Sequence, residues 1–200
     1  ICKQNICRLK VDWKLPEAPE SVIWQQSYGT KEMQEEIEFS WVSEMARHVG
    51  NVVHRWLQQI AEDEMRGWDS ARIHKIQNKF RQNLFASGMT GSDQEIRDAV
   101  DRIILALTNA INDTRGQWIL GTQRLAQNEL RITGVVNNES MSWVIDRTFC
   151  DSNGIRWIID YKTSSHEGSD IQGFLDREIV RYRSQLNRYA IFMQQIDPRP

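Results

Sequence analysis

Residues 157–164 read Trp-Ile-Ile-Asp-Tyr-Lys-Thr-Ser, and this stretch decides the fold. Its aromatic and β-branched first half favours a β-strand. Side chains alternate along a strand, so Asp160 and Lys162 emerge on one face and Tyr161 on the other. A carboxylate can hold a divalent cation, and an ammonium can orient a water or stabilise charge that develops on a phosphate. The pair suits metal-assisted phosphodiester hydrolysis, and a surface ion pair is the alternative interpretation of the same residues.

A second candidate strand, residues 141–149, carries its own carboxylate at Asp146. The residues between the two strands have the composition of a tight turn and predict an antiparallel hairpin. We expect a three-residue loop, 152–154, with Gly154 in the left-handed conformation of a type I turn and G1 bulge. This register sets Asp146 directly opposite Asp160 on one face. Opposed like charges destabilise a sheet, and a metal ion between them would relieve that cost.

Four motifs, taken in order, resemble the PD-(D/E)xK nucleases and, among these, the RecB/AddA-type members. The dipeptide Ile145-Asp146 and the later Asp160-Tyr161-Lys162-Thr163 resemble the core of the superfamily. Residues 182–190, YRSQLNRYA, resemble the Q-x-x-x-Y helix of the RecB-like members. Residues 50–57, GNVVHRWL, resemble their G-x-x-x-H-x-x-L segment. The four motifs together span most of the chain.

The resemblance implies a metal-dependent deoxyribonuclease site. His54, Asp146 and Asp160 would hold Mg²⁺ or Mn²⁺, and the backbone carbonyl of Tyr161 would complete the protein ligands. Oxygen-rich ligation suits these ions better than zinc, and one imidazole is compatible with Mn²⁺. Lys162 would orient the attacking water.

A last helix is predicted over residues 175–196, and it carries further candidate residues. Arg181, Gln185 and Tyr189 recur at every fourth position and form a row along one edge of that helix. Such a row can position a phosphate backbone, and a solvated edge with a core tyrosine is the alternative. The resemblance implies that Gln185 and Tyr189 steady the substrate or Lys162.

Periodicity separates the remaining candidate side chains. His54 falls about 160° from the centre of the apolar stripe of a helix predicted over residues 35–64, which makes a core histidine improbable and leaves an exposed one as the alternative. His48 and His74 match no motif and are predicted to lie on the surface. Glu129 is a possible supporting acid, but a solvated glutamate at the start of a strand is the preferred interpretation.

Bulk properties set the class. Two hundred residues with 26% charged and 40% hydrophobic side chains suit one ordinary globular domain. A net charge of −2 requires any DNA contact to come from a local basic patch or a neighbouring domain. Three cysteines without CxxC spacing argue against a disulfide framework or zinc site and favour a cytoplasmic setting. No apolar run predicts a membrane span, and Ile1 in place of Met suggests a processed chain or an excised fragment.

The expected fold class is α/β, with a restriction-endonuclease-like core, a small mixed sheet flanked by helices, and an N-terminal helical region. Residues 1–30 are expected to form an extended lead-in segment, and residues 31–200 the RecB-like nuclease domain. We expect residues 28–115 to be mostly helical and residues 116–200 to form the nuclease core. Further helices are predicted over residues 69–86 and 92–112, and a three-stranded meander over 128–163.

The resemblance implies the C-terminal exonuclease module of a RecB-like helicase–nuclease of the exodeoxyribonuclease V type, acting in DNA recombination and repair. Its expected partners are a DNA single strand fed by a helicase motor, and helicase domains of the same polypeptide or complex. The alternative is a non-cleaving nucleic-acid-binding or partner-docking module that retains the fold. The complete set of acid and lysine positions argues against that alternative.

Overall fold

The computed structural model describes residues 41–136, 139–162 and 171–197. All of them belong to the second of the two units into which the chain divides, Glu38–Pro200. The lead-in segment predicted for residues 1–30 lies outside the described residues, as does Thr163 of the core motif.

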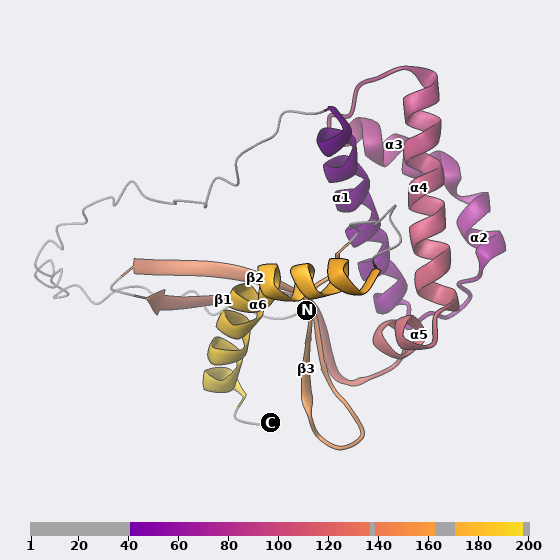
Figure 1. The fold of residues 1–200 in the computed structure, drawn as a ribbon. Helices are drawn as coiled ribbons and strands as arrows, with labels where there is room; N and C mark the ends of the chain where they lie inside the picture. Colours follow the sequence, from indigo (N-terminus) through magenta and orange to yellow (C-terminus); the bar gives the residue numbers. More distant parts are fainter. Residues whose placement is uncertain (1–40, 137–138, 163–170, 198–200) are drawn as a thin grey trace, which may run out of the picture. The chain divides into compact units, whose positions relative to one another are not determined.

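Helices occupy the chain from residue 41 to residue 120 (Figure 1). They are α1 (Trp41–Glu62), α2 (Ser70–Lys75), α3 (Gln77–Ala86), α4 (Asp93–Asn112) and α5 (Thr114–Leu120). Val53 and Ile60 of α1 belong to one apolar core with Ile103 and Leu107 of α4, and each of the four is at most 2% exposed. None of the helices in the described ranges combines the length and apolar composition that a bilayer-spanning segment needs.

Helix α4 begins as the sequence predicts. The Ser92 hydroxyl accepts a hydrogen bond from the Glu95 N–H, and the Glu95 carboxylate accepts one from the Ser92 N–H, which makes a capping box. The prediction of a single helix over residues 69–86 is wrong. The helix is interrupted at Ile76, which has φ −95° and ψ 9°, and this interruption separates α2 from α3. Ile73 before the break and Phe80 after it are both fully buried.

Helix α5 lies where the sequence predicts the end of the preceding helix. The Asp113 carboxylate caps it by accepting hydrogen bonds of 2.9 Å from the N–H groups of Arg115 and Gly116. A side chain at Gly116 would run into the backbone carbonyl of Ala110 in α4. This glycine therefore permits a close approach between two helices, whereas its sequence context resembles a helix terminator.

The strands β1 (Arg124–Val136), β2 (Glu139–Cys150) and β3 (Arg156–Ile159) form an antiparallel meander in that order, as predicted. We expected a mixed sheet, and the described strands pair antiparallel throughout. Figure 1 shows the β2–β3 hairpin turning away from the longer β1–β2 ribbon.

The hairpin has the predicted register. Arg147 pairs with Ile159, and Cys150 pairs with Arg156. The Asp151 N–H donates to the Ile155 carbonyl at 3.0 Å, and Gly154 has φ +84°, as a three-residue loop with a G1 bulge requires.

Strand β3 ends at Ile159, earlier than predicted. The N–H of Tyr161 donates to the Asp146 carboxylate at 2.6 Å, so a side chain takes the place of backbone pairing just beyond the strand. Continuing the register by one step sets Asp160 opposite Asp146.

Helix α6 (Ile171–Ile196) packs on the sheet through its C-terminal half, where Tyr189 and Met193 join Ile132 and Ile145 in an apolar cluster. The apolar stripe expected along the whole helix fails nearer its start, because Ile179 is 55% exposed. A helix of 26 residues is about 39 Å long, and the neighbouring strand β3 has only four residues to cover it.

A buried arginine joins the helices to the sheet. Arg147 is 1% exposed, and its guanidinium donates to the carbonyls of Ile119 and Gly121 at 2.7 and 2.9 Å and to the Asn128 Oδ1 at 2.7 Å. Those two carbonyls lie at the C-terminal end of α5, where the helix dipole favours a positive charge. Arg147 thereby fixes α5, β1 and β2 together one residue away from Asp146.

Candidate functional site

The β2–β3 hairpin presents the first carboxylate of the site. Asp146 lies near the middle of β2, its side chain is 14% exposed, and its Oδ2 accepts the hydrogen bond from the Tyr161 N–H. Burial raises the pKa of Asp146, against the Tyr161 hydrogen bond and the His54 imidazole, and the negative charge of Asp160 raises it further. The fold therefore disfavours the charged form of Asp146 relative to the same group in water.

The second carboxylate, Asp160, is held from two sides. The Lys162 Nζ lies 2.7 Å from the Asp160 Oδ2. The Gln185 Nε2 donates to the Asp160 Oδ1 at 3.3 Å and lies 2.7 Å from the Tyr189 hydroxyl oxygen. Burial opposes the charge of Lys162, but the hydrogen bond and charge of Asp160 outweigh it and raise the pKa of Lys162. Helix α6 and the end of β3 thus meet at this aspartate.

The histidine of α1 reaches the same place from the helical part of the chain. The His54 Nδ1 lies 3.6 Å from the Asp146 Oδ2, and its side chain is 31% exposed. The imidazole meets the ring of Tyr161 edge-on, with 5.8 Å between ring centroids. His54 is therefore neither a core residue nor a fully solvated one, and it lies more than ninety positions before Asp146 in the chain.

The side chain of Tyr161 contacts the helical part of the chain. Its ring packs against the apolar core of the helices, and its buried hydroxyl has no hydrogen-bond partner among the described residues. Burial raises the pKa of Tyr161 well above its ordinary value. The role expected for its carbonyl stays a prediction.

Glu129 is exposed, as the preferred interpretation predicted, and it lies across from Asp146, as a supporting acid would. It is in the middle of β1 rather than at its start, and the pairs Asn128–Arg147 and Leu130–Ile145 set it across from Asp146. Partial burial raises the pKa of Glu129, and the charge of Asp146 adds to this effect. The backbone of Glu129 is left-handed, with φ +50°, a conformation that is costly for a residue with a side chain. The register across β1 and β2 was the signal that could have identified it.

Arg181 and the two other histidines differ in their surroundings. Arg181 is exposed, and its contacts include Glu178 at 3.8 Å and the ring of Tyr182 at 5.3 Å. The prediction that His48 lies on the surface is wrong, because His48 is 6% exposed. Its Nδ1 lies 2.9 Å from the hydroxyl oxygen of Ser87 at the end of α3. His74 is exposed, as predicted.

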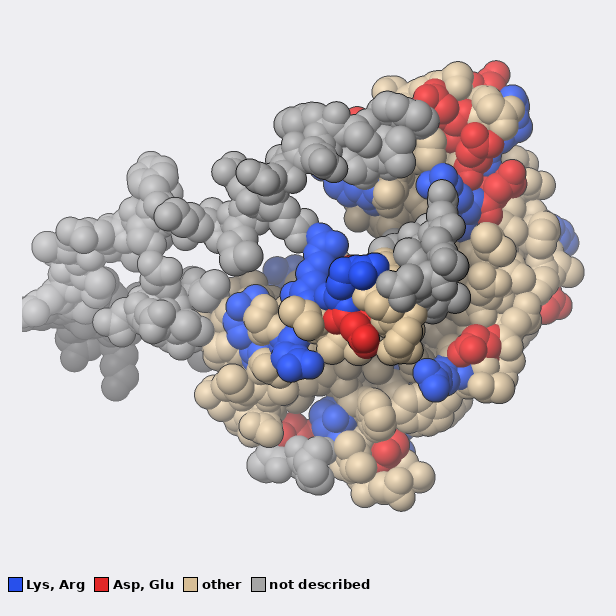
Figure 2. Space-filling view, in the orientation of Figure 1, with Lys and Arg blue, Asp and Glu red and all other residues tan. Residues whose placement is uncertain are grey.

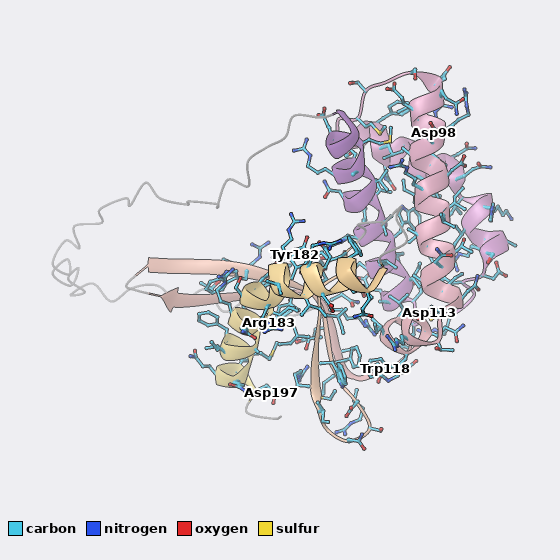
Figure 3. All side chains as sticks on the ribbon, viewed as in Figure 1. Asp98, Asp113, Trp118, Tyr182, Arg183 and Asp197 are labelled. Carbon is cyan, nitrogen blue, oxygen red and sulfur yellow. The ribbon has the colours of Figure 1, made fainter. Side chains whose placement is uncertain are left out.

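A groove of about 540 Å³ runs between β3 and α6 and opens beside the carboxylate of Asp160. Lys162 and Arg183 contribute to its lining, which is otherwise mostly apolar. Figure 3 shows Tyr182 and Arg183 on α6. Lys and Arg side chains gather over this region in Figure 2. The exposed arginines of α6 are Arg177, Arg181, Arg183 and Arg188.

The side chains gathered around Asp146 have the chemistry of a divalent-cation site. Two carboxylates and an imidazole are ligands that suit Mg²⁺ or Mn²⁺, and burial raises the pKa of Asp146, which a bound cation would oppose. Within the described ranges, no three His, Cys, Asp or Glu side chains already converge as a metal cluster. Asp160 instead directs its oxygens to Lys162 and Gln185. The residue types fit the ion, and Asp160 would have to exchange a protein contact for it.

A sheet with Asp146 on β2, with Asp160 and Lys162 just beyond the end of β3, and with helices on its flanks is consistent with a nuclease core. A sequence model described as the PD-(D/E)XK nuclease superfamily matches residues 27–200, and the chain belongs to this superfamily. Its members are generally metal-dependent nucleases that use Mg²⁺ or similar ions and act on nucleic acid. The expected α/β fold class is confirmed. A search of curated proteins finds no match to the chain.

Proposed function

We propose that the chain is the DNA-cleaving domain of a RecB-like helicase–nuclease, the C-terminal exonuclease module of an exodeoxyribonuclease V-type enzyme in recombination and repair. The proposed nuclease activity rests on Asp146 and Asp160, which the hairpin register sets opposite each other, and on the ion pair between Lys162 and Asp160. The approach of His54 to Asp146 supports the RecB-like placement, because the histidine segment is a motif of those members.

His54, Asp146 and Asp160 would hold the divalent ion, together with the Tyr161 carbonyl. Bound there, Mg²⁺ or Mn²⁺ would polarise the scissile phosphate and favour deprotonation of the attacking water. Glu129 is a further carboxylate for this set, because its charge and that of Asp146 interact. The raised pKa of Asp146 supports the assignment, since a cation is the partner that its charged form lacks.

Lys162 orients the attacking water and stabilises negative charge on the phosphate in the transition state. Gln185 positions Asp160, and Tyr189 in turn positions Gln185 from the apolar cluster beneath α6. This refines the expectation that Gln185 and Tyr189 steady the substrate or Lys162, because their contacts lead to the carboxylate.

The substrate is proposed to be a DNA single strand that a helicase motor feeds along α6. The exposed arginines of α6 (Arg177, Arg181, Arg183 and Arg188) supply the local basic patch that the net charge of −2 does not provide. Arg181 contributes to backbone binding as one of this set.

The proposal is tested by cleavage of linear single- and double-stranded DNA with Mg²⁺, with Mn²⁺ and with chelator. We expect wild-type protein to cleave DNA only with metal, and Lys162→Ala to lower the rate by at least about a hundredfold, because a group that stabilises the transition state is lost. Lys79→Ala is the matched control, since it removes an exposed lysine from α3. Undiminished cleavage by Lys162→Ala would contradict the mechanism, and metal-independent DNA binding without cleavage by wild type would favour the non-cleaving module.

A further inference from the structure

The ammonium of Lys162 has a second contact, which lies on α6. Its Nζ is 4.3 Å from the centroid of the Tyr182 ring, in addition to 2.7 Å from the Asp160 Oδ2. The Tyr182 side chain is half-buried, and its ring lines the groove between β3 and α6. The ring face therefore offers the cation a binding surface that is independent of the carboxylate.

We propose that Tyr182 is a positioning residue of the nuclease reaction, whose ring face keeps the Lys162 ammonium at the site when Asp160 binds the divalent ion. This inference rests on the proposed function for its catalytic consequence. The contact itself stands on the geometry of the described chain.

A divalent ion and the Lys162 ammonium compete for one carboxylate, that of Asp160. In the structure the Asp160 oxygens are engaged by Lys162 and Gln185. A divalent ion on Asp160 competes directly with the ammonium for the same oxygens, because both are cations. A lysine side chain has four rotatable bonds and substantial rotamer entropy, so a lysine released by Asp160 disperses unless a second contact holds it.

The aromatic face supplies that second contact. The ring quadrupole attracts a cation, and the attraction strengthens where water is partly excluded. The Lys162 side chain is 35% exposed, so its head is partly desolvated. The guanidinium of Arg181 lies 5.3 Å from the centroid of the same ring, and this second positive charge disfavours movement of Lys162 toward the exposed side of α6.

The experiment compares Tyr182→Leu with Tyr182→Phe. Leucine fills part of the same space without a π-face, whereas phenylalanine keeps the ring and loses only the hydroxyl. With saturating DNA and Mg²⁺, we expect Tyr182→Leu to lower kcat about tenfold with little change in KM, and Tyr182→Phe to recover most of that loss. Phe85→Leu is the matched control, because it removes the exposed ring beneath Arg81 in α3.

A second measurement reads the contact without metal or substrate. Lysines labelled by reductive ¹³C-methylation keep their charge, and a methylated ammonium over a ring face resonates upfield. Lys162→Arg assigns the resonance. We expect an upfield signal in wild type and in Tyr182→Phe, and its return to the position of solvent-exposed lysines in Tyr182→Leu.

The outcomes separate the two proposals. Absence of an upfield lysine signal in wild type overturns the inference, whether or not the protein cleaves DNA. A Tyr182→Leu variant that loses the upfield signal and keeps the wild-type kcat also overturns it. If wild type shows the signal and cleaves no DNA, the proposed function fails and the catalytic role of Tyr182 fails with it, while the ring contact is established.

Discussion

At Asp146, folding favours the neutral carboxyl, whereas the proposed metal binding needs the charged carboxylate. Burial raises its pKa, and the charge of Asp160 raises it further. A carboxyl whose pKa is higher in the folded chain than in the unfolded chain stabilises the fold below its unfolded pKa. That contribution is lost as pH rises through the folded pKa. Above that pH, the ionised Asp146 destabilises the metal-free protein.

Asp146→Asn should therefore stabilise the metal-free protein at pH 8 while removing metal-dependent activity. We expect Tm to rise by about 2–4 °C in the presence of chelator, because the substitution removes a buried charge and keeps an acceptor for the Tyr161 N–H. The gain should be smaller at pH 4, because the raised pKa of Asp146 leaves more of the wild-type carboxyl protonated in the folded chain there. Thermal unfolding followed by circular dichroism at both pH values measures this, and a lower Tm for the variant at pH 8 contradicts the account.

For His54 we expect a large effect on metal affinity and a small effect on stability. Its imidazole is 31% exposed and 3.6 Å from Asp146, so it contributes little to packing. His54→Ala should weaken Mn²⁺ binding at least about tenfold, since removal of even indirect supports of a metal site has effects of that size. Titration calorimetry measures the affinity, and Tm in chelator should stay nearly unchanged. His74→Ala, an exposed histidine on α2, is the control. Equal Mn²⁺ affinity of the His54 variant and wild type would refute the assignment.

At the scale of elements, the β2–β3 hairpin fixes the relation between the two aspartates. Gly154 has φ +84°, and a side chain there would meet no atom within 4 Å, so only the backbone conformation restricts the position. Gly154→Ala should lower the free energy of unfolding by about 1–2 kcal/mol, and Gly154→Asn by less, because asparagine tolerates the left-handed region. Urea denaturation measures both. A Gly154→Ala variant as stable as wild type would show that the loop does not require this conformation.

The hairpin and the capping box of α4 could be predicted because local chemistry specifies them. Gly154 and the three-residue loop set the register, and Ser92 with Glu95 marks a helix start. The sequence around Gly116 predicts the end of a helix, but Gly116 lies inside α5. Its lack of a side chain permits a close approach to Ala110, and this contact exists only once the helices have packed. The break at Ile76 has no such local signal, and the burial of Ile73 and Phe80 on both sides of it is a tertiary effect.

Helix α6 illustrates a different limit. Its periodicity predicts one continuous apolar stripe, and Tyr189 and Met193 confirm the part that lies over β1 and β2. Ile179 and Leu186 are 55% and 38% exposed, because burial depends on which element lies opposite each turn of the helix. Sequence periodicity identifies the face of a helix, and the partner element decides how much of that face is covered.

For the molecule as a whole, the candidate site is assembled from segments far apart in the chain. Asp146, Asp160 and Lys162 follow from strand periodicity and one hairpin. Periodicity alone placed His54 off the apolar core and identified no partner for it. Only the resemblance of residues 50–57 to a family motif made His54 a candidate site residue. Glu129 required the register of β1 against β2, which the separate strand patterns do not contain.

The charge distribution is also a property of the whole chain. A net charge of −2 argues against a general nucleic-acid binder, yet α6 carries four exposed arginines, of which Arg183 lines the groove. Lys and Arg side chains gather on the face of the molecule that Figure 2 shows. Arg147 does not belong to that patch, because its guanidinium is buried against α5 and Asn128. The positive charge near the proposed DNA path is therefore concentrated by folding rather than by composition.

We propose that the two hairpin aspartates would hold one divalent ion, and anomalous diffraction from crystals soaked in Mn²⁺ tests this most directly. The account predicts one anomalous peak about 2.0–2.6 Å from carboxylate oxygens of both Asp146 and Asp160, with the His54 imidazole also in contact. The same soak of Asp146→Asn crystals should show no peak there. A fully soaked wild-type crystal with no peak between these carboxylates, or with its peak on other residues, would contradict the account.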